Sequence, residues 1–234
     1  LQDGATNLGT VTFTITIGAT STATSTFSNA GAILIPGTGT SGPASPYPST
    51  INVAGVTGAV TKVTASLKLM NHTFPDDVDV LLVRPGGQKL LLMSDVGGST
   101  DIVNITLTFD DAAAGQIPDA GPAVSGTFKP SNIGTGDTLP APAPVGPYPD
   151  PQLLSVFNGV NPNGTWSLFI VDDVGGDIGN INGGWELSIT SADPVCCVAA
   201  CTLTCPANVT QSNDPDQCGA VVNYPAPTTT GDCG

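Results

Sequence analysis

The sequence is poor in basic residues, since only five Lys and Arg stand against 19 Asp and Glu, and the formal net charge is −14. Charged residues make up only 10% of the chain and aromatic residues 5%. A strongly acidic chain repels phosphates, so we expect neither nucleic acid nor an anionic membrane surface as a partner. Apolar runs such as 78–83 and 90–93 are far too short to cross a bilayer.

Residues that support catalysis are also scarce. His72 is the only histidine and no Gly-x-Ser-x-Gly segment is present, so a Ser-His-Asp triad is not expected. A zinc site built from several histidines is excluded for the same reason. Paired carboxylates can hydrolyse glycosides, but Asp doublets beside turn glycines suit ion binding better. We therefore predict no catalytic residues and expect His72 to be a packed or hydrogen-bonded loop residue.

Helical periodicity is absent, whereas alternation of apolar and polar residues recurs, for example in 10–17 and 60–70. Further strand-like runs, bounded by Gly, Pro, Asn or Asp, lie at 78–83, 89–93, 102–109, 153–157, 166–171 and 184–189. Strands resume after the Pro/Gly-rich segments 36–48 and 139–151, which we therefore expect to be ordered loops. Short strands without helical crossovers predict an all-β fold, a jelly-roll-like antiparallel β-sandwich.

Asp is unusually frequent, because 18 of the 19 acidic residues are Asp and only Glu186 is Glu. Many of them stand in pairs at the ends of apolar runs, where their mutual repulsion costs free energy unless a cation neutralises it. Asp77 and Asp79 are expected on one face of a strand, since side-chain direction repeats every two residues. Asp is also a favoured turn residue that binds nearby backbone N–H groups, which is the simpler interpretation. We predict a structural calcium ion, with candidate ligands Asp77, Asp79, Asp95, Asp110, Asp111, Asp172, Asp173 and Asp177.

Two loops resemble each other. Residues 94–99 and 172–177 each contain a carboxylate at a strand end that is followed by a Gly-Gly turn. Such loops can lie side by side at one end of a sandwich and bring their carboxylates together.

The six cysteines are confined to the last part of the chain and have no histidine near them. Adjacent cysteines do not both ligate one tetrahedral zinc without strain, so we expect disulfides and hence an oxidising, extracellular compartment. The cysteines are Cys196, Cys197, Cys201, Cys205, Cys218 and Cys233. The chain begins with Leu1 and shows no signal peptide, and we expect a processed protein or a piece of a longer one.

Residues 25–190 resemble the P-domain (Homo B domain) that follows subtilisin-like catalytic domains in proprotein convertases and in many secreted bacterial proteins. The resemblance rests on Asp76-Asp77-Val78-Asp79 with the apolar run after it, on Asn163-Gly164-Thr165-Trp166 and on Gly183-Gly184-Trp185. Further matching segments are 85–87, 90–97, 109–112, 126–130 and 157–159. The resemblance implies an eight-stranded jelly-roll-like sandwich with Trp166 and Trp185 in its core.

From Leu203 the chain resembles the start of a hyalin repeat (HYR) domain, an immunoglobulin-like extracellular adhesion module, of which only the first third is present. The resemblance rests on Cys205-Pro206-Ala207-Asn208 and Gln217-Cys218-Gly219. It implies a bridge between Cys218 and Cys233, while Cys205 pairs with a cysteine beyond Gly234 or with one of those at 196, 197 and 201.

We accordingly expect an N-terminal β segment at 1–21, a P-domain-like sandwich at 22–191, a Cys-rich linker at 192–204 and a partial HYR-like segment at 205–234. The expected function is a non-catalytic structural or adhesive module of a secreted or cell-surface bacterial protein. Its partners are neighbouring domains or identical subunits, which a strand at 10–17 could link into a filament by strand exchange. The alternative is a domain that supports a subtilisin-like protease domain outside this chain.

Overall fold

The computed structural model describes residues 2–3, 6–7, 20–134, 136–149 and 151–194, together with 202–204, 212, 214–216, 220–221, 223, 226 and 228–230. The chain divides into two units. One unit is Thr22–Asp193, and the other holds the two chain ends, Leu1–Ser21 and Pro194–Gly234. All of the candidate metal ligands lie in the first unit.

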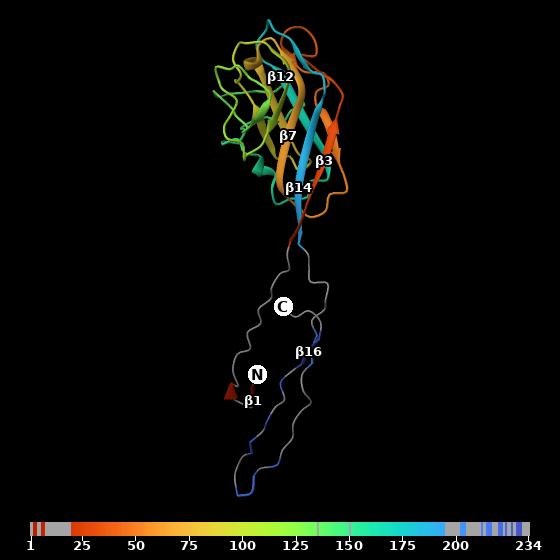
Figure 1. Cartoon of the computed structure of the whole chain (residues 1–234), viewed down its shortest axis with the longest axis vertical. Coiled ribbons are helices and arrows are strands. Elements are labelled where there is room, and N and C mark those ends of the chain that lie inside the picture. Colours follow the sequence, from red (N-terminus) through yellow and green to blue (C-terminus); the bar gives the residue numbers. More distant parts are fainter. Residues whose placement is uncertain are drawn as a thin grey trace. The chain divides into compact units, whose positions relative to one another are not determined.

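The unit Thr22–Asp193 is built from two β-sheets that face each other (Figure 1). The seven-stranded sheet contains β3 (Thr20–Asn29), β4 (Ile33–Ile35), β7 (Ala59–His72), β10 (Ile102–Phe109), β11 (Gly126–Phe128), β13 (Gly179–Ile181) and β14 (Trp185–Pro194). The five-stranded sheet contains β5 (Gly42–Pro43), β6 (Ser49–Val53), β8 (Val78–Val83), β9 (Lys89–Met93) and β12 (Gly164–Asp172). This is the predicted all-β sandwich.

Strand order places β7 and β8 at the centre of their sheets. In the larger sheet β7 pairs antiparallel with β10 on one side and with β13 and β14 on the other. In the smaller sheet β12 pairs antiparallel with β8, which pairs antiparallel with β9. Strand β11 runs parallel to β10. Because β8 lies between β12 and β9, the loops at the ends of these three strands meet at one end of the sandwich.

The core between the sheets is filled from the alternating positions of the strands. On β7 the buried apolar side chains are Val60, Val63, Ala65, Leu67 and Met70. Two buried tryptophans complete it, and each indole N–H has an acceptor. Trp166 donates to the Pro162 carbonyl at 2.9 Å, and Trp185 donates to the Ser49 hydroxyl at 2.9 Å. The second bond joins β14 of one sheet to β6 of the other.

The five-stranded sheet is covered on its outer face as well. Leu81, Leu91, Phe169 and Val171 form a second cluster there, against which Leu139 and Ala143 of the Pro/Gly-rich segment pack. Burial on both faces explains why Val78–Val83 reads as one continuous apolar run instead of alternating. The segment expected as an ordered loop therefore packs on the sheet. This contact also positions the residues that precede the segment next to the ends of the strands.

Most of the predicted strands are confirmed, and 78–83, 89–93 and 102–109 coincide with β8, β9 and β10. The strand predicted at 153–157 is wrong, because Leu154–Phe157 forms a 3₁₀ helix, η2. The strand predicted from 184 begins at Trp185. Gly184 has φ +64°, and a Cβ there would lie 1.9 Å from the Asn29 carbonyl oxygen of β3, so only glycine allows the two strands to approach this closely.

The other unit contributes two short strand pairs. Strand β1 (Gln2–Asp3) pairs antiparallel with β2 (Thr6–Asn7), and β15 (Thr202–Thr204) pairs antiparallel with β16 (Thr228–Thr230). The latter pair agrees with the β segment expected near the C-terminus. The predicted strand at 10–17 and all six cysteines lie outside the described residues, so strand exchange and the disulfides stay predictions.

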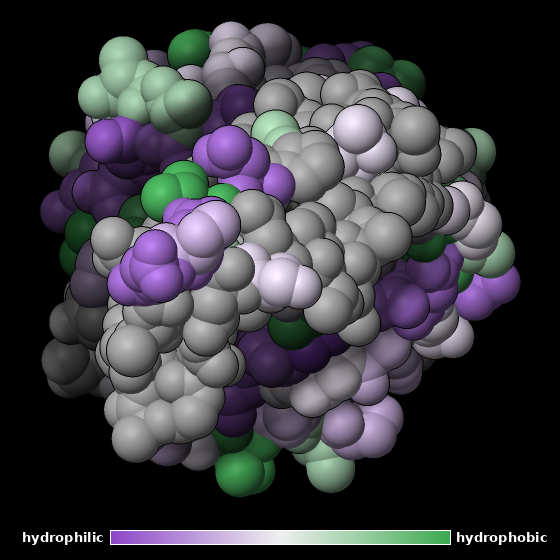
Figure 2. Space-filling view, turned by 90° about the horizontal axis from the view of Figure 1, so that it is seen from below, coloured by the Kyte–Doolittle hydropathy of each residue, from purple (hydrophilic) through white to green (hydrophobic). Residues whose placement is uncertain are grey.

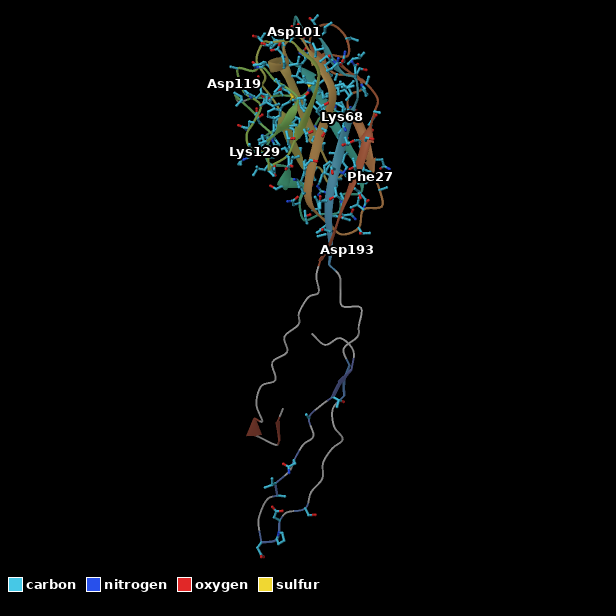
Figure 3. The ribbon with its side chains drawn as sticks, viewed as in Figure 1. Phe27, Lys68, Asp101, Asp119, Lys129 and Asp193 are labelled. Atoms are coloured by element: carbon cyan, nitrogen blue, oxygen red, sulfur yellow. The ribbon has the colours of Figure 1, made fainter. Side chains whose placement is uncertain are left out.

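Polar side chains dominate the coloured part of the face shown in Figure 2, where hydrophobic side chains stand singly. Within the described part of the chain, no helix has the length and apolar character needed to cross a membrane. Asp101 and Asp193 mark opposite ends of the unit Thr22–Asp193 (Figure 3). The candidate site lies at the Asp101 end. His72, which lies beside the site, pairs with Ile102 in the sheet register, and Ile102 follows Asp101 in the chain.

Candidate metal site

The ends of three neighbouring strands position the candidate site. Asp172 at the end of β12 is paired with Val78 at the start of β8, and Met93 at the end of β9 is paired with Val80. The two loops of similar sequence, 94–99 and 172–177, therefore lie at the same end of the sheet, as suggested by the sequence, but with the start of β8 between them. Their carboxylates meet those of the 3₁₀ turn η1 (Pro75–Asp77), which leads into β8.

Three carboxylates form the closest group. Asp79, Asp95 and Asp137 each offer an oxygen, and these oxygens lie within 4.8 Å of one another. Asp79 is only 3% exposed, and the Ser94 hydroxyl donates a hydrogen bond of 2.6 Å to its Oδ1. Asp95 follows β9, whereas Asp137 comes from the long connection between β11 and η2. These residues are far apart in the sequence, and the fold brings them together.

Five more carboxylates lie close by, with Asp76 and Asp173 near Asp95, and Asp77, Asp172 and Asp177 near one another. Among the residues that the structure describes, no Lys or Arg nitrogen lies within 4.0 Å of any of the eight. Lys62 and Lys68 bind other acids, Asp110 at 2.7 Å and Glu186 at 2.9 Å. The cluster therefore concentrates negative charge without compensation.

Burial and mutual repulsion shift the pKa values in this cluster upward. Burial, and secondly the charges of Asp137, Asp173 and Asp95, raise the pKa of Asp79 to about 7 despite the bond from Ser94. Burial and neighbouring Asp charges likewise raise the pKa of Asp172 to about 7 and that of Asp77 to about 6. The pKa values of Asp95 and Asp173 are raised for the same reasons. Ionising all of these groups together costs free energy, which a bound cation would offset.

A buried histidine lies beside the cluster. His72 Nε2 is 3.2 Å from Asp172 Oδ2, and both side chains are fully buried. His72 Nδ1 faces the backbone of Phe74, 2.9 Å from its carbonyl oxygen and 3.2 Å from its amide nitrogen. Burial lowers the pKa of His72. Among the residues that the structure describes, neither Asp172 oxygen has a hydrogen-bond donor. Asp172 is thus a buried polar group without a full set of partners, at the edge of the carboxylate cluster.

The structure places the sequence-predicted ligands in two locations. Asp79, Asp95, Asp172 and Asp173 lie at the cluster, and Asp177 lies at its edge, where its Oδ1 accepts from the Thr73 hydroxyl at 2.9 Å. Asp77 is also there, but it belongs to η1, so the prediction that it shares a strand face with Asp79 is wrong.

Asp110 and Asp111 do not join the cluster, which corrects their assignment as ligands of the same ion. Both follow β10 at the opposite end of the sandwich, because Phe109 pairs with Ala65 while Ile102 pairs with His72. Lys62 neutralises Asp110, and this contact lowers the pKa of that carboxyl below its ordinary value. Asp111 accepts the backbone N–H groups of Leu154 and Ser155 at 2.8 and 2.9 Å, so it caps η2.

Replacing Asp111 with Ala should destabilise the fold by about 1–2 kcal/mol, because it leaves the two amides at the start of η2 without their acceptor. Urea denaturation followed by circular dichroism measures this change. Asp119→Ala is the matched control, since Asp119 is exposed in a loop, and it should change the free energy of unfolding by less than about 0.5 kcal/mol. Equal effects of the two substitutions would refute the capping role.

Asp137 and Asp76 were missed by the sequence reasoning. Asp137 stands alone in a Gly-, Thr- and Pro-rich segment, with no apolar run next to it to mark a strand end. The only available indication was its position shortly before a segment expected to be ordered.

Comparison with known proteins gives little further guidance. No protein-family model matches the chain, and neither does any curated protein. Among solved structures, the chain is similar to part of the crystal structure of the Aeromonas sobria serine protease (ASP) in complex with the chaperone ORF2. The similarity has 13% sequence identity and a TM-score of 0.37, and it covers 76% of this chain and 28% of that one. A likeness this distant carries no functional argument.

Proposed function

We propose that this chain is a non-catalytic, calcium-stabilised module with a structural or adhesive role in a secreted or cell-surface bacterial protein. The observation that carries the proposal is the cluster of eight carboxylates at one end of a rigid sandwich, to which no Lys or Arg of the described residues is paired. Such a cluster is unfavourable in an empty, ionised state, and a divalent cation would remove most of the repulsion.

Calcium suits this cluster better than the other common divalent ions. It takes six to eight oxygen ligands in flexible geometry, and eight carboxylates with the surrounding loop carbonyls supply only oxygen. Zinc favours Cys and His, and the single His72 makes its contacts to Phe74 and Asp172. Magnesium requires near-ideal octahedral geometry and keeps several waters, which suits the crowded group of Asp79, Asp95 and Asp137 less well.

The non-catalytic part of the proposal is supported by the surroundings of His72. This histidine is fully buried, and its ring nitrogens face a backbone group and a carboxylate rather than a hydroxyl or thiol nucleophile. An extracellular location is supported by the clustered cysteines and by the resemblance to P-domain and HYR segments in the sequence.

The second candidate is a P-domain that supports a subtilisin-like protease domain outside this chain. It is favoured by the segments that resemble the P-domain, among them those around Asp79 and Trp166. The HYR-like segment favours adhesion, since support of a protease gives no reason for it. Coding sequence upstream of Leu1 with the Asp, His and Ser blocks of a subtilisin-like enzyme would decide for the protease.

Calcium should raise the melting temperature of the chelated protein by roughly 5–10 °C at saturating concentration, because only the folded state assembles the ligands. Differential scanning calorimetry in EDTA and after adding excess CaCl₂ measures the shift. The double variant Asp79→Asn/Asp95→Asn should lose it, and Asp110→Asn/Asp119→Asn, which changes the same charge outside the cluster, should keep it. An unchanged melting temperature on adding calcium to the wild-type protein would refute the proposal.

A further inference from the structure

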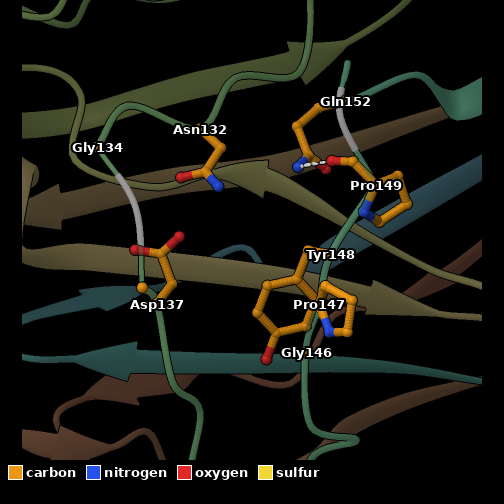
Figure 4. A pocket seen from close by; sticks show the side chains of 9 residues that line it. Asn132, Gly134, Asp137, Gly146, Pro147, Tyr148, Pro149 and Gln152 are labelled. Carbon is orange, nitrogen blue, oxygen red and sulfur yellow. Dashed lines mark hydrogen bonds between the residues drawn. The ribbon is translucent and has the colours of Figure 1, made fainter.

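A cavity of about 380 Å³ lies next to the carboxylate group (Figure 4). Its walls include Asn132, Asp137, Pro147, Tyr148, Pro149 and Gln152. Asn132 and Asp137 lie on one side of it, and Tyr148 with the two prolines lies on the other. Its volume is within the range of roughly 300–1,000 Å³ that small-molecule sites occupy in proteins.

The cavity and the candidate metal site share a wall. Asp137 lines the cavity and is also one of the three closest carboxylates. Gly134 lines the cavity too, and a Cβ on it would lie 3.4 Å from Asp95 Oδ2. An ion held by Asp79, Asp95 and Asp137 would therefore border the cavity. Since calcium takes six to eight oxygens, positions that these carboxylates leave free can be filled by oxygens of a molecule in the cavity.

The other walls combine apolar faces with a hydrogen-bonding group. Tyr148 and the two prolines beside it form the apolar side, and the Lys89 ammonium lies 5.4 Å from the centroid of the Tyr148 ring. Asn132 Oδ1 is shielded from solvent and has no hydrogen-bond partner among the residues that the structure describes. A buried acceptor without a donor is costly, so a rotation of the Asn132 side chain that brings this oxygen to a ligand hydroxyl in the cavity would be favourable. Gln152, in contrast, is already bonded to Leu91 and Pro149.

We propose that this cavity binds a neutral sugar residue, with vicinal hydroxyls on a calcium ion held by Asp79, Asp95 and Asp137 and an apolar sugar face against Tyr148. A sugar offers hydroxyl donors for Asn132, oxygens for the ion and a C–H face for the ring in one small molecule. A neutral sugar is favoured over an acidic one because the surrounding carboxylates repel anions. The inference rests on the proposed calcium-stabilised function and names the ligand class for its adhesive role.

Saturation-transfer NMR with the methyl glycosides of mannose, galactose and fucose tests this inference, and isothermal calorimetry of CaCl₂ binding runs on the same samples. At least one glycoside should receive saturation in calcium and lose it in EDTA. Asn132→Ala should weaken glycoside binding about tenfold, the cost of one buried hydrogen bond, while calcium affinity stays within about twofold of wild type. Tyr148→Ala should abolish glycoside binding, and Asn52→Ala, at an exposed position on β6, should change neither ligand.

The outcomes separate the two proposals. If calcium binds but none of the three glycosides receives saturation, the sugar site is refuted and the calcium-stabilised module stands. Glycoside binding that persists in EDTA, or whose affinity is unchanged in Asn132→Ala, also contradicts the proposed site. If no calcium binds, the proposed function itself fails.

Discussion

Asp79→Asn should change the stability of this protein in opposite directions with and without calcium. In EDTA at pH 8 the substitution removes a buried carboxylate whose pKa is raised from 3.8 to about 7. This shift corresponds to a destabilisation of the folded state by the ionised carboxylate of about 4 kcal/mol at most. Asn keeps an oxygen that can accept the hydrogen bond from Ser94, so the chelated variant should be more stable than wild type. In saturating calcium the variant lacks one negatively charged ligand and should be less stable.

Chemical denaturation at pH 8 in EDTA and in CaCl₂ measures both signs. Asp101→Asn is the matched control, because Asp101 is exposed outside the cluster and should have little effect in either condition. A destabilised variant in EDTA would show that the Asp79 carboxylate is favourable in the empty site, which contradicts the repulsion argument.

The same carboxyls determine how stability depends on pH in the chelated protein. The folded-state pKa values of Asp77, Asp79 and Asp172 are raised, so these groups stabilise the fold when protonated and this contribution is lost as pH rises from about 4 to about 7. The lowered pKa values of His72 and Asp110 act in the opposite direction. Three large shifts outweigh these two, so stability in EDTA should fall across that window, and less so in Asp79→Asn.

Trp166→Ala should lower the free energy of unfolding by about 3–5 kcal/mol, a large part of the stability of an ordinary domain. Trp166 is fully buried, and its ring meets that of Phe157 edge to face at 5.1 Å and 69°. The substitution leaves a cavity between the sheets and removes the donor to the Pro162 carbonyl. Urea denaturation followed by far-ultraviolet circular dichroism measures the loss.

Val103→Ala serves as a control on the surface, since Val103 is 68% exposed, and it should cost less than about 0.5 kcal/mol. Trp166→Phe should lie between the two, because it keeps an aromatic ring but not the indole N–H. A loss below about 1 kcal/mol for Trp166→Ala would mean that this part of the core does not support the sandwich.

The fold could be predicted from local patterns. The alternation in 60–70 and the apolar run 78–83 reflect how many faces of each strand are buried, and a single sequence carries that information. The run at 153–157 has the same composition as a strand, yet it forms a 3₁₀ turn because Asp111, more than forty residues earlier, caps its amides. No local pattern contains that contact.

The candidate site was predictable only in part, for a related reason. Carboxylates at strand ends can be expected to converge when the strands are neighbours, as with Asp79, Asp95 and Asp172. Asp110 also follows a strand, but at the other end, and which end a residue occupies depends on the strand order. Asp137 reaches the site because Leu139 and Ala143 pack on the outer face of the sheet and hold the preceding residues over the strand ends.

The pairing of β3 with β14 has a mechanical consequence. These are the first and last strands of the unit Thr22–Asp193, and they lie side by side, with the Thr24 and Thr190 hydroxyls 2.9 Å apart (Figure 1). Asn29 lies next to Gly184, so the two strands run antiparallel and the chain enters and leaves the unit at adjacent points. Tension applied through those points would peel the strand pair open one hydrogen bond at a time, whereas shear would load all of the bonds together. The same geometry lets the unit be spliced into a loop of a host protein without spreading that loop.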